Sequence, residues 1–407
     1  MNDKLNMSGV SSDEGSFVRN LEGRTGTGFQ EGSHVHKDWW AKTISYESGM
    51  EAIESGVGER DDILCERQHM QPSISESGRF CFEYIDGREF FPTEHAIKQM
   101  ATASNTSTFY MRSLLNNPLD SKNEERFERD RQDAETLVVA SRNALRRVPK
   151  DKKFRFRTYT DGTLRAWLTE SYAEVDNRWY MEALQDIIPN GRLSHWKGDA
   201  DTIFGNILVP ESIIDYGQDD DSDYGAMVSI GNCEIGTRRI SQYPSLFRSI
   251  CINGCIWGQV KGTSVSRVHR GKIDLNELKF QIGNNIETQL SLIPAGLERF
   301  MATRSMKIVG KMKNVIATIC KDNKLSKVES SEVLTQWVTN EREHENLFGV
   351  VNAVTRAGQN FSNSSWVKFD SLGGKLLDMG DNKWSNILSR AGSTEDKSVN
   401  AVFSGSV

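Results

Sequence analysis

The stretch Phe154–Thr160 reads FRFRTYT and is followed at once by Asp161-Gly162. Phenylalanine and threonine alternate there with Arg155 and Arg157, and a period of two is typical of a β-strand with two different faces. The Asp-Gly pair is a strong turn signal. The stretch therefore predicts a strand that carries both arginines on one face and ends in a turn.

Upstream of this strand, the sequence predicts a hairpin and two helices. Phe80–Ile85 and Arg88–Phe91 flank Asp86-Gly87, which is the pattern of a hairpin turn. Thr93-Glu94 then opens a predicted helix. The charged segment 123–147 carries spaced apolar residues, which predicts a surface helix.

Downstream, short elements are expected in mixed order. The patterns predict helices at 164–168, at 179–188 and around 246–248, and strands at 226–230 and 233–239. Asn253-Gly254 predicts another hairpin turn, and Pro294 suits the first position of a helix. The expected fold class is α+β, with a short central sheet rich in antiparallel pairs, surrounding helices and a helical C-terminal third.

Composition divides the 407 residues into a central part and two ends. Residues 1–37 and 391–407 are small and polar and bury too little apolar surface to offset the entropy of ordering, so we expect a disordered arm and a disordered tail. Between them we expect an N-terminal α+β part at 38–210 and a C-terminal part with long helices at 226–390. Six acids and no base occupy 211–223, which marks 211–225 as an acidic loop or a seam between domains.

The sequence shows no sign of membrane, secretion or cofactor motifs. No apolar run approaches the ~18 residues of a membrane span, and the N-terminus lacks the apolar segment of a signal peptide. We therefore expect a cytoplasmic protein whose six scattered cysteines stay reduced. Walker A, GxSxG, HExxH and paired CxxC motifs are missing, so we predict no cofactor, no metal ligands and no established type of active site.

Five separated motifs resemble one known family. They are TEHAIKQM at 93–100, LRAWLTESYAEVDN at 164–177, SIGNCEIGTRRISQYPSLFRSICINGCI at 229–256, HRGK at 269–272 and VVNAVTRAGQ at 350–359. In this order they are similar to motifs of the uncharacterised phage/plasmid-like protein family, a domain of unknown function, over roughly residues 80–380. The resemblance implies a mobile-element protein in the cytoplasm of a bacterial host and implies no established reaction. The Gly/Ser-rich arm at 1–37 departs from the family pattern.

Basic residues are segregated within a chain whose net charge is −6. Eight bases face one acid between Arg142 and Arg157, and thirteen bases face four acids between Arg238 and Lys313. Such clusters neutralise phosphates, and neighbouring aromatic side chains stack on unpaired bases. The predicted nucleic-acid-binding residues are Arg155, Arg157, Tyr159, Arg165, Arg238, Arg239, Arg267, His269, Arg270 and Lys272. We expect their cations to converge on one positive face.

Other interpretations of the same residues stay open at this stage. A run of charges usually forms a solvated face, and the bases at 142–157 could pair with the acids at 124–135 or in the acidic loop. An enzyme using Glu234, His269 and Arg248 is conceivable, although their spacing fits no known mechanism. For Glu234 and Arg248 we instead expect a buried ion pair that supports the central sheet.

The function predicted from these observations is nucleic-acid binding in a phage or plasmid context. Single-stranded DNA during replication or recombination is the ligand that we favour, and the oligomeric state, including a homo-oligomer, is left open. The alternative is a non-catalytic protein-interaction factor that acts on a host complex. An enzyme is the third option.

Overall fold

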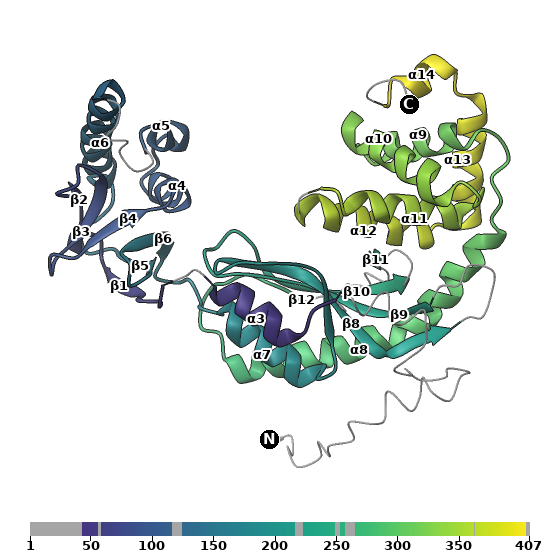
Figure 1. Cartoon of the computed structure of the whole chain (residues 1–407), viewed down its shortest axis with the longest axis horizontal. Helices are drawn as coiled ribbons and strands as arrows, with labels where there is room; N and C mark the ends of the chain where they lie inside the picture. Colours follow the sequence, from purple (N-terminus) through teal and green to yellow (C-terminus); the bar gives the residue numbers. More distant parts are fainter. Residues whose placement is uncertain are drawn as a thin grey trace, which may run out of the picture.

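The computed structural model describes residues 43–55, 58–115, 124–215, 223–248, 253–256, 265–361 and 363–403, and the arm predicted at 1–37 lies outside them. The described chain forms three lobes, an N-terminal and a C-terminal lobe that rise from the two ends of a central one (Figure 1). Two β-sheets and many helices confirm the predicted α+β class. Among the described helices, none has the length and apolar character needed to cross a membrane.

The N-terminal lobe is a six-stranded sheet covered by three helices. Its strand order is β1-β5-β6-β4-β3-β2, and every pairing is antiparallel except that of β4 with β6. Helix α6 packs on β2 and β3, and α4 packs on β6. The elements are β1 (Ile63–Glu66), η1 (Arg67–His69), β2 (Met70–Ile74), β3 (Phe80–Tyr84), β4 (Glu89–Pro92), α4 (Glu94–Ala103), α5 (Thr108–Ser113), α6 (Glu124–Leu145), β5 (Lys153–Thr158) and β6 (Thr163–Thr169).

The turn signals in this lobe are correct, but one predicted helix is a strand. Gly87 has a φ of 89° between β3 and β4, and Thr93 caps α4 by accepting a hydrogen bond from the backbone of Ala96. The segment 164–168, expected to be helical, lies in β6. Gly162, with a φ of 86°, closes a hairpin that pairs β6 with β5. Because Trp167 then packs against Phe82 and Phe156 in the core, tertiary contacts outweigh the local helical pattern.

The central lobe is built on a second, antiparallel sheet. Its strand order is β11-β10-β9-β8-β7, and β12 also pairs with β10. Helix α3 lies against β7 and α7, and the long helix α8 packs on β9 and β10. The elements are α3 (Tyr46–Glu54), α7 (Asn177–Ile187), β7 (Arg192–Gly198), β8 (Thr202–Asp215), β9 (Asp223–Cys233), β10 (Ile240–Arg248), β11 (Asn253–Ile256), β12 (Val265–Arg267) and α8 (Leu275–Ala302).

Several predictions for this lobe are wrong at the level of single elements. Residues 246–248, expected in a helix, end strand β10, and 234–239, expected in a strand, form the β9–β10 turn with Gly236 at a φ of 78°. Asn253-Gly254 pairs with Arg248 and Phe247 inside β11 instead of forming a turn. Pro294 lies in the interior of α8 instead of at its first position.

The C-terminal lobe is helical and shares one apolar core with the central sheet. It comprises η2 (Thr303–Ser305), α9 (Met312–Asp322), α10 (Lys327–Gln336), a π-helical turn η3 (Trp337–Glu341), α11 (Leu347–Gly358), α12 (Asn363–Leu377), α13 (Asp381–Ser393) and α14 (Asp396–Asn400). The prediction of a disordered tail at 391–407 is wrong for residues 391–403. Ala391, Val399 and Phe403 are buried in this core, and only 404–407 lie outside the described residues.

The apolar cores divide the chain differently from the predicted boundaries. One core fills the N-terminal lobe, and a separate one joins the central and C-terminal lobes. The described chain therefore begins in the central lobe with α3, forms the N-terminal lobe and returns to the central lobe at α7. The acidic run is not a seam between domains, because Asp215 of β8 is paired with Asp223 of β9 in one sheet. Residues 216–222 lie outside the described part.

Candidate nucleic-acid interface

The structure separates the predicted nucleic-acid-binding residues into a buried and an exposed group. Arg157, Tyr159 and Arg165 lie between the N-terminal and central lobes and are almost inaccessible to solvent. Arg239, Arg270 and Lys272 are exposed, whereas Arg238 and Arg267 are half-buried. The prediction that all these cations form one positive face is therefore wrong for the buried group.

The buried group forms an ion cluster around Glu234, which is fully buried after β9. Arg165 donates from Nη1 to Glu234 at 2.9 Å, and Arg60 donates from Nη2 to the same carboxylate at 2.7 Å. The backbone N–H of Asn177 adds a hydrogen bond of 2.8 Å. We call Arg60, Asp62, Arg157, Arg165, Asp176, Asp201 and Glu234 the interlobe ion cluster.

Arg157 is one of two nearly inaccessible arginines in the interlobe ion cluster. It donates from Nε to Asp62 and from Nη2 to Asp176, both at 2.7 Å, and its side chain is 1% exposed. Burial alone would lower the pKa of Arg157, but Asp62, Glu234 and Asp176 outweigh that effect and hold its pKa above the usual value. The residue stays charged and holds the two lobes together, so it is not available to a phosphate.

Tyr159 is also unavailable as a stacking platform. Its hydroxyl accepts a hydrogen bond of 3.2 Å from Arg165, whose guanidinium lies 4.5 Å from the centre of the tyrosine ring. Burial raises the pKa of Tyr159 to about 12. The ring is occupied by a cation–π contact inside the protein.

The predicted ion pair between Glu234 and Arg248 does not form. Arg248 instead donates to Glu341 at 3.2 Å, and both side chains are buried where β10 meets the π-helical turn. Strand β10 separates Arg248 from the β9–β10 turn that carries Glu234. The structure therefore does not bring together the set of Glu234, His269 and Arg248 considered for an enzyme.

His269 has a structural environment. Its ring stacks on Tyr172 at a centroid distance of 5.1 Å, and Nδ1 lies 3.1 Å from the carbonyl of Ala173. Burial lowers its pKa, so the neutral form is favoured. A neutral, buried imidazole is a poor phosphate ligand.

The exposed cations come from two adjoining segments. Arg267 of β12 is paired in register with Ile240, which directly follows Arg238 and Arg239. Within the described part of the chain, Arg239, Arg270 and Lys272 form no ion pair. Arg238 lies over the ring of Phe204, and Arg155 pairs with Glu174. The exposed Arg239, Arg270 and Lys272 stay candidate phosphate contacts.

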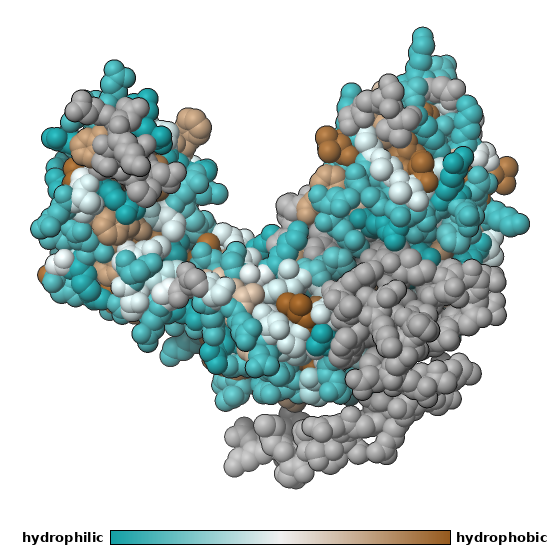
Figure 2. All heavy atoms as spheres, in the orientation of Figure 1, coloured by the Kyte–Doolittle hydropathy of each residue, from teal (hydrophilic) through white to brown (hydrophobic). Residues whose placement is uncertain are grey.

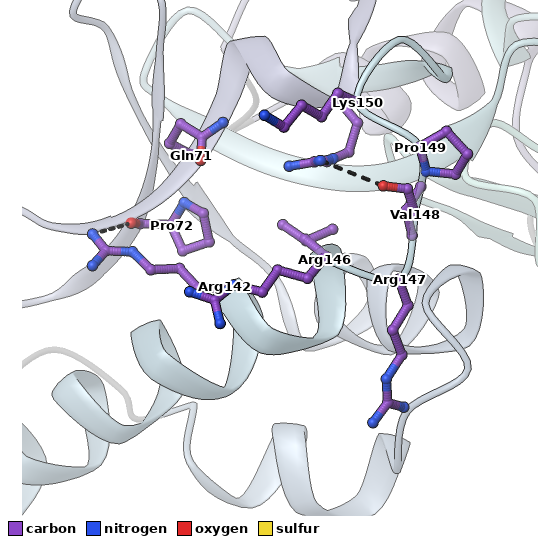
Figure 3. Close-up of a pocket in the computed structure, with 10 residues that line it drawn as sticks. Gln71, Pro72, Arg142, Arg146, Arg147, Val148, Pro149 and Lys150 are labelled. Atoms are coloured by element: carbon purple, nitrogen blue, oxygen red, sulfur yellow. Dashed lines mark hydrogen bonds between the residues drawn. The ribbon is translucent and has the colours of Figure 1, made fainter.

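A second positive site, which we call the basic pocket, lies in the N-terminal lobe (Figure 3). Its volume is about 620 Å³. Five of the lining side chains are basic, and none of the described residues that line it is acidic. The lining consists of Arg67, Gln71, Pro72, Arg142, Leu145, Arg146, Arg147, Val148, Pro149 and Lys150.

Local geometry explains why these cations gather. Arg142 lies in the last turn of α6, and Arg146 and Arg147 follow directly, where cations are favoured by the partial negative charge of a helix C-terminus. Backbone hydrogen bonds from Arg67 to Lys152 and from Gln68 to Lys150 hold η1 beside this turn. Segments separated by more than seventy residues thus converge on one cavity.

The lining cations point in different directions (Figure 3). Arg142 donates to the carbonyl of Pro72 at 3.1 Å, while the Lys150 side chain extends toward Gln71. Arg147 points away from the other labelled side chains and donates to the carbonyl of Asn105 at 3.2 Å.

Arg67 is the buried member of the basic pocket. Its residue is only 8% exposed, and Nη2 makes a long hydrogen bond of 3.4 Å to the carbonyl of Val148. Its Nε is buried without a hydrogen-bond partner, and no carboxylate in the described residues pairs with it. A buried guanidinium without a counter-charge is costly, which favours an anion at this position.

The N-terminal lobe also exposes aromatic side chains. Phe109 and Tyr110 on α5 are 82% and 48% exposed, and α5 begins shortly after Asn105, which Arg147 contacts. The visible face of the N-terminal lobe is largely hydrophilic, whereas apolar patches are more prominent on the C-terminal lobe (Figure 2). Exposed aromatic rings beside cations are typical of proteins that bind single strands.

The structure divides the basic residues of 142–157 between two environments. Arg142 lies in the last turn of α6, Arg146 and Lys150 follow that helix, and all three stay accessible, while Arg157 lies in strand β5 at a lobe boundary. Arg67 carries no sequence signal, because its importance depends on contacts with residues far along the chain.

Metal chemistry finds no support in the described ranges, where no cluster of three or more histidine, cysteine or acidic side chains could hold an ion. Cys65, Cys81, Cys233 and Cys320 are buried free thiols. Comparison of the chain with protein-family models, curated proteins and solved structures finds no match, so the resemblance to the phage/plasmid-like family stays a prediction.

Proposed function

We propose that this protein binds nucleic acid through the basic pocket, and that single-stranded DNA is its ligand. The observation that carries the proposal is the buried, unpaired Arg67 in a cavity with four further basic side chains. Phosphate groups supply the negative charge that this lining lacks. In the interlobe ion cluster, by contrast, each buried arginine already has carboxylate partners and needs no external anion.

Two features favour a single strand over a duplex. The pocket is concave and small, which suits flexible nucleotides more than a rigid helix. Phe109 and Tyr110 offer exposed rings on which unpaired bases can stack, a contact that a base-paired duplex cannot make. Replication or recombination of a mobile element is the setting that we propose, and it rests on the sequence resemblance.

The test is direct binding of labelled oligonucleotides by the full-length protein. Fluorescence anisotropy at moderate salt should give clear saturation with single-stranded DNA and weaker binding of duplex DNA of the same sequence. A third measurement with single-stranded RNA shows whether the protein prefers DNA or RNA. If a stable, monodisperse protein binds none of the three even at low salt, the proposal is wrong, and a protein-interaction role is favoured.

A further inference from the structure

The depth of Arg67 indicates which part of a strand enters the basic pocket. Arg142, Arg146 and Lys150 are exposed at the rim, whereas Arg67 is more than nine-tenths buried behind them. An internal phosphodiester has a sugar on both sides and a single negative charge. It can contact the exposed cations, but it is bulkier and carries less charge than a terminal phosphate, so it suits the buried guanidinium less well.

A phosphate at the end of a strand has a sugar on one side only and carries more than one negative charge. A phosphate monoester exposes three oxygens and carries about −1.5 to −2 charges at pH 7. Arg67 lines the cavity, so the part of its guanidinium that faces the cavity can donate to this phosphate, and such charge-assisted hydrogen bonds are strong. The rim cations then neutralise the second charge.

The rest of the lining fits the nucleotide that carries this phosphate. Leu145, Val148, Pro149 and Pro72 supply apolar surface, and Gln71 supplies a neutral donor and acceptor. The cavity volume of about 620 Å³ falls in the range of small-molecule sites.

We propose that the basic pocket recognises the phosphorylated end of a nucleic-acid strand, with Arg67 as the residue that contacts the terminal phosphate. This inference rests on the proposed function. End recognition would give the protein a preference for strand ends, whereas a surface that binds phosphates only by charge would have no such preference.

The experiment compares single-stranded oligonucleotides of one sequence that carry a 5′-phosphate, a 3′-phosphate or hydroxyls at both ends. A terminal phosphate should raise affinity roughly tenfold to hundredfold, which corresponds to hydrogen bonds with a charged group. The two phosphorylated arms show which end is read. Equal affinity for all three overturns end recognition and leaves strand binding intact, whereas no binding of any of them overturns the proposed function itself.

Variants link the preference to Arg67. Arg67→Gln should bring the affinity ratio between phosphorylated and unphosphorylated strands close to one. Arg129→Gln is the matched control, because it removes the same charge from an exposed position on α6 that does not line the basic pocket, and it should keep the full ratio. An undiminished ratio in Arg67→Gln contradicts the assignment.

A second variant covers the case in which Arg67→Gln does not fold. Arg142→Gln combined with Arg146→Gln changes only exposed side chains, and it should lower both the affinity and the phosphate preference. If that folded double variant keeps the full preference, the basic pocket is not the site of end recognition.

Discussion

At the residue scale, buried arginines have different roles in the interlobe ion cluster and in the basic pocket. Arg157 is surrounded by carboxylates between two lobes, whereas Arg67 is buried beside other cations. A paired buried cation contributes to structure, and an unpaired one favours an external anion.

Removal of the central carboxylate should therefore destabilise the protein strongly. Glu234→Gln leaves Arg165 and Arg60 without their shared counter-charge, and we expect a loss of about 3–5 kcal/mol in the free energy of unfolding, measured in urea. Glu174→Gln is the control, because Glu174 pairs with Arg155 at the surface and should cost at most about 1 kcal/mol. Similar small losses in both variants would show that the interlobe ion cluster does not stabilise the fold.

Residue-level chemistry could be predicted from the sequence only in part. The excess of bases at 142–157 is visible in the sequence, but whether a base meets a carboxylate depends on strands that pair far along the chain. Asp62 and Glu234 contact Arg157, although they lie 95 and 77 residues away from it in the sequence. No local pattern indicates those contacts, which is why Arg157 was assigned to the nucleic-acid interface.

At the scale of elements, turn signals are reliable where glycine adopts a positive φ, as at Gly87 and Gly162. The short apolar segments 164–168 and 246–248 were misread because a run of that length fits a helix or a buried strand equally well. Asn253-Gly254 shows that even a strong turn pair can lie within a strand when its neighbours pair across the sheet.

The composition of the C-terminal segment predicts that it is dispensable, whereas its packing predicts that it stabilises the fold. Phe403 and Val399 are buried, so Phe403→Ala should cost about 3–5 kcal/mol and lower the thermal midpoint by several degrees. Lys397→Ala, an exposed change on α14, should leave the midpoint nearly unchanged. If deletion of 396–407 has no effect on the midpoint, this docking is wrong.

Acid should weaken the packing of α13 on α9. Hydrogen bonds from Arg390 hold the pKa of Asp322 below its usual value, so the contribution of this pair is present above the unfolded pKa of about 4 and is lost as the pH falls further. Urea denaturation at pH 6 and pH 3 should show a smaller loss of stability on acidification in Asp322→Asn than in the wild type. An equal loss would mean that the pair contributes nothing to acid sensitivity.

At the scale of the whole molecule, two basic regions lie on a protein with a net charge of −6. The basic pocket belongs to the N-terminal lobe, and the exposed cations at 238–239 and 267–272 belong to the central sheet. We assign strand binding to the basic pocket, because, of these two regions, it is the one that combines concavity with a buried guanidinium that no carboxylate of the described residues pairs with.

The most direct test of this assignment is the salt dependence of single-stranded DNA affinity in two charge-matched variants. Arg142→Gln/Arg146→Gln/Lys150→Gln should flatten the plot of log K against log salt by roughly 0.7 for each lost phosphate contact, about 2 in total. Arg239→Gln/Arg270→Gln/Lys272→Gln removes the same charge from the central sheet and should change the slope much less. An unchanged slope in the pocket variant, or a larger change in the central-sheet variant, would contradict the account.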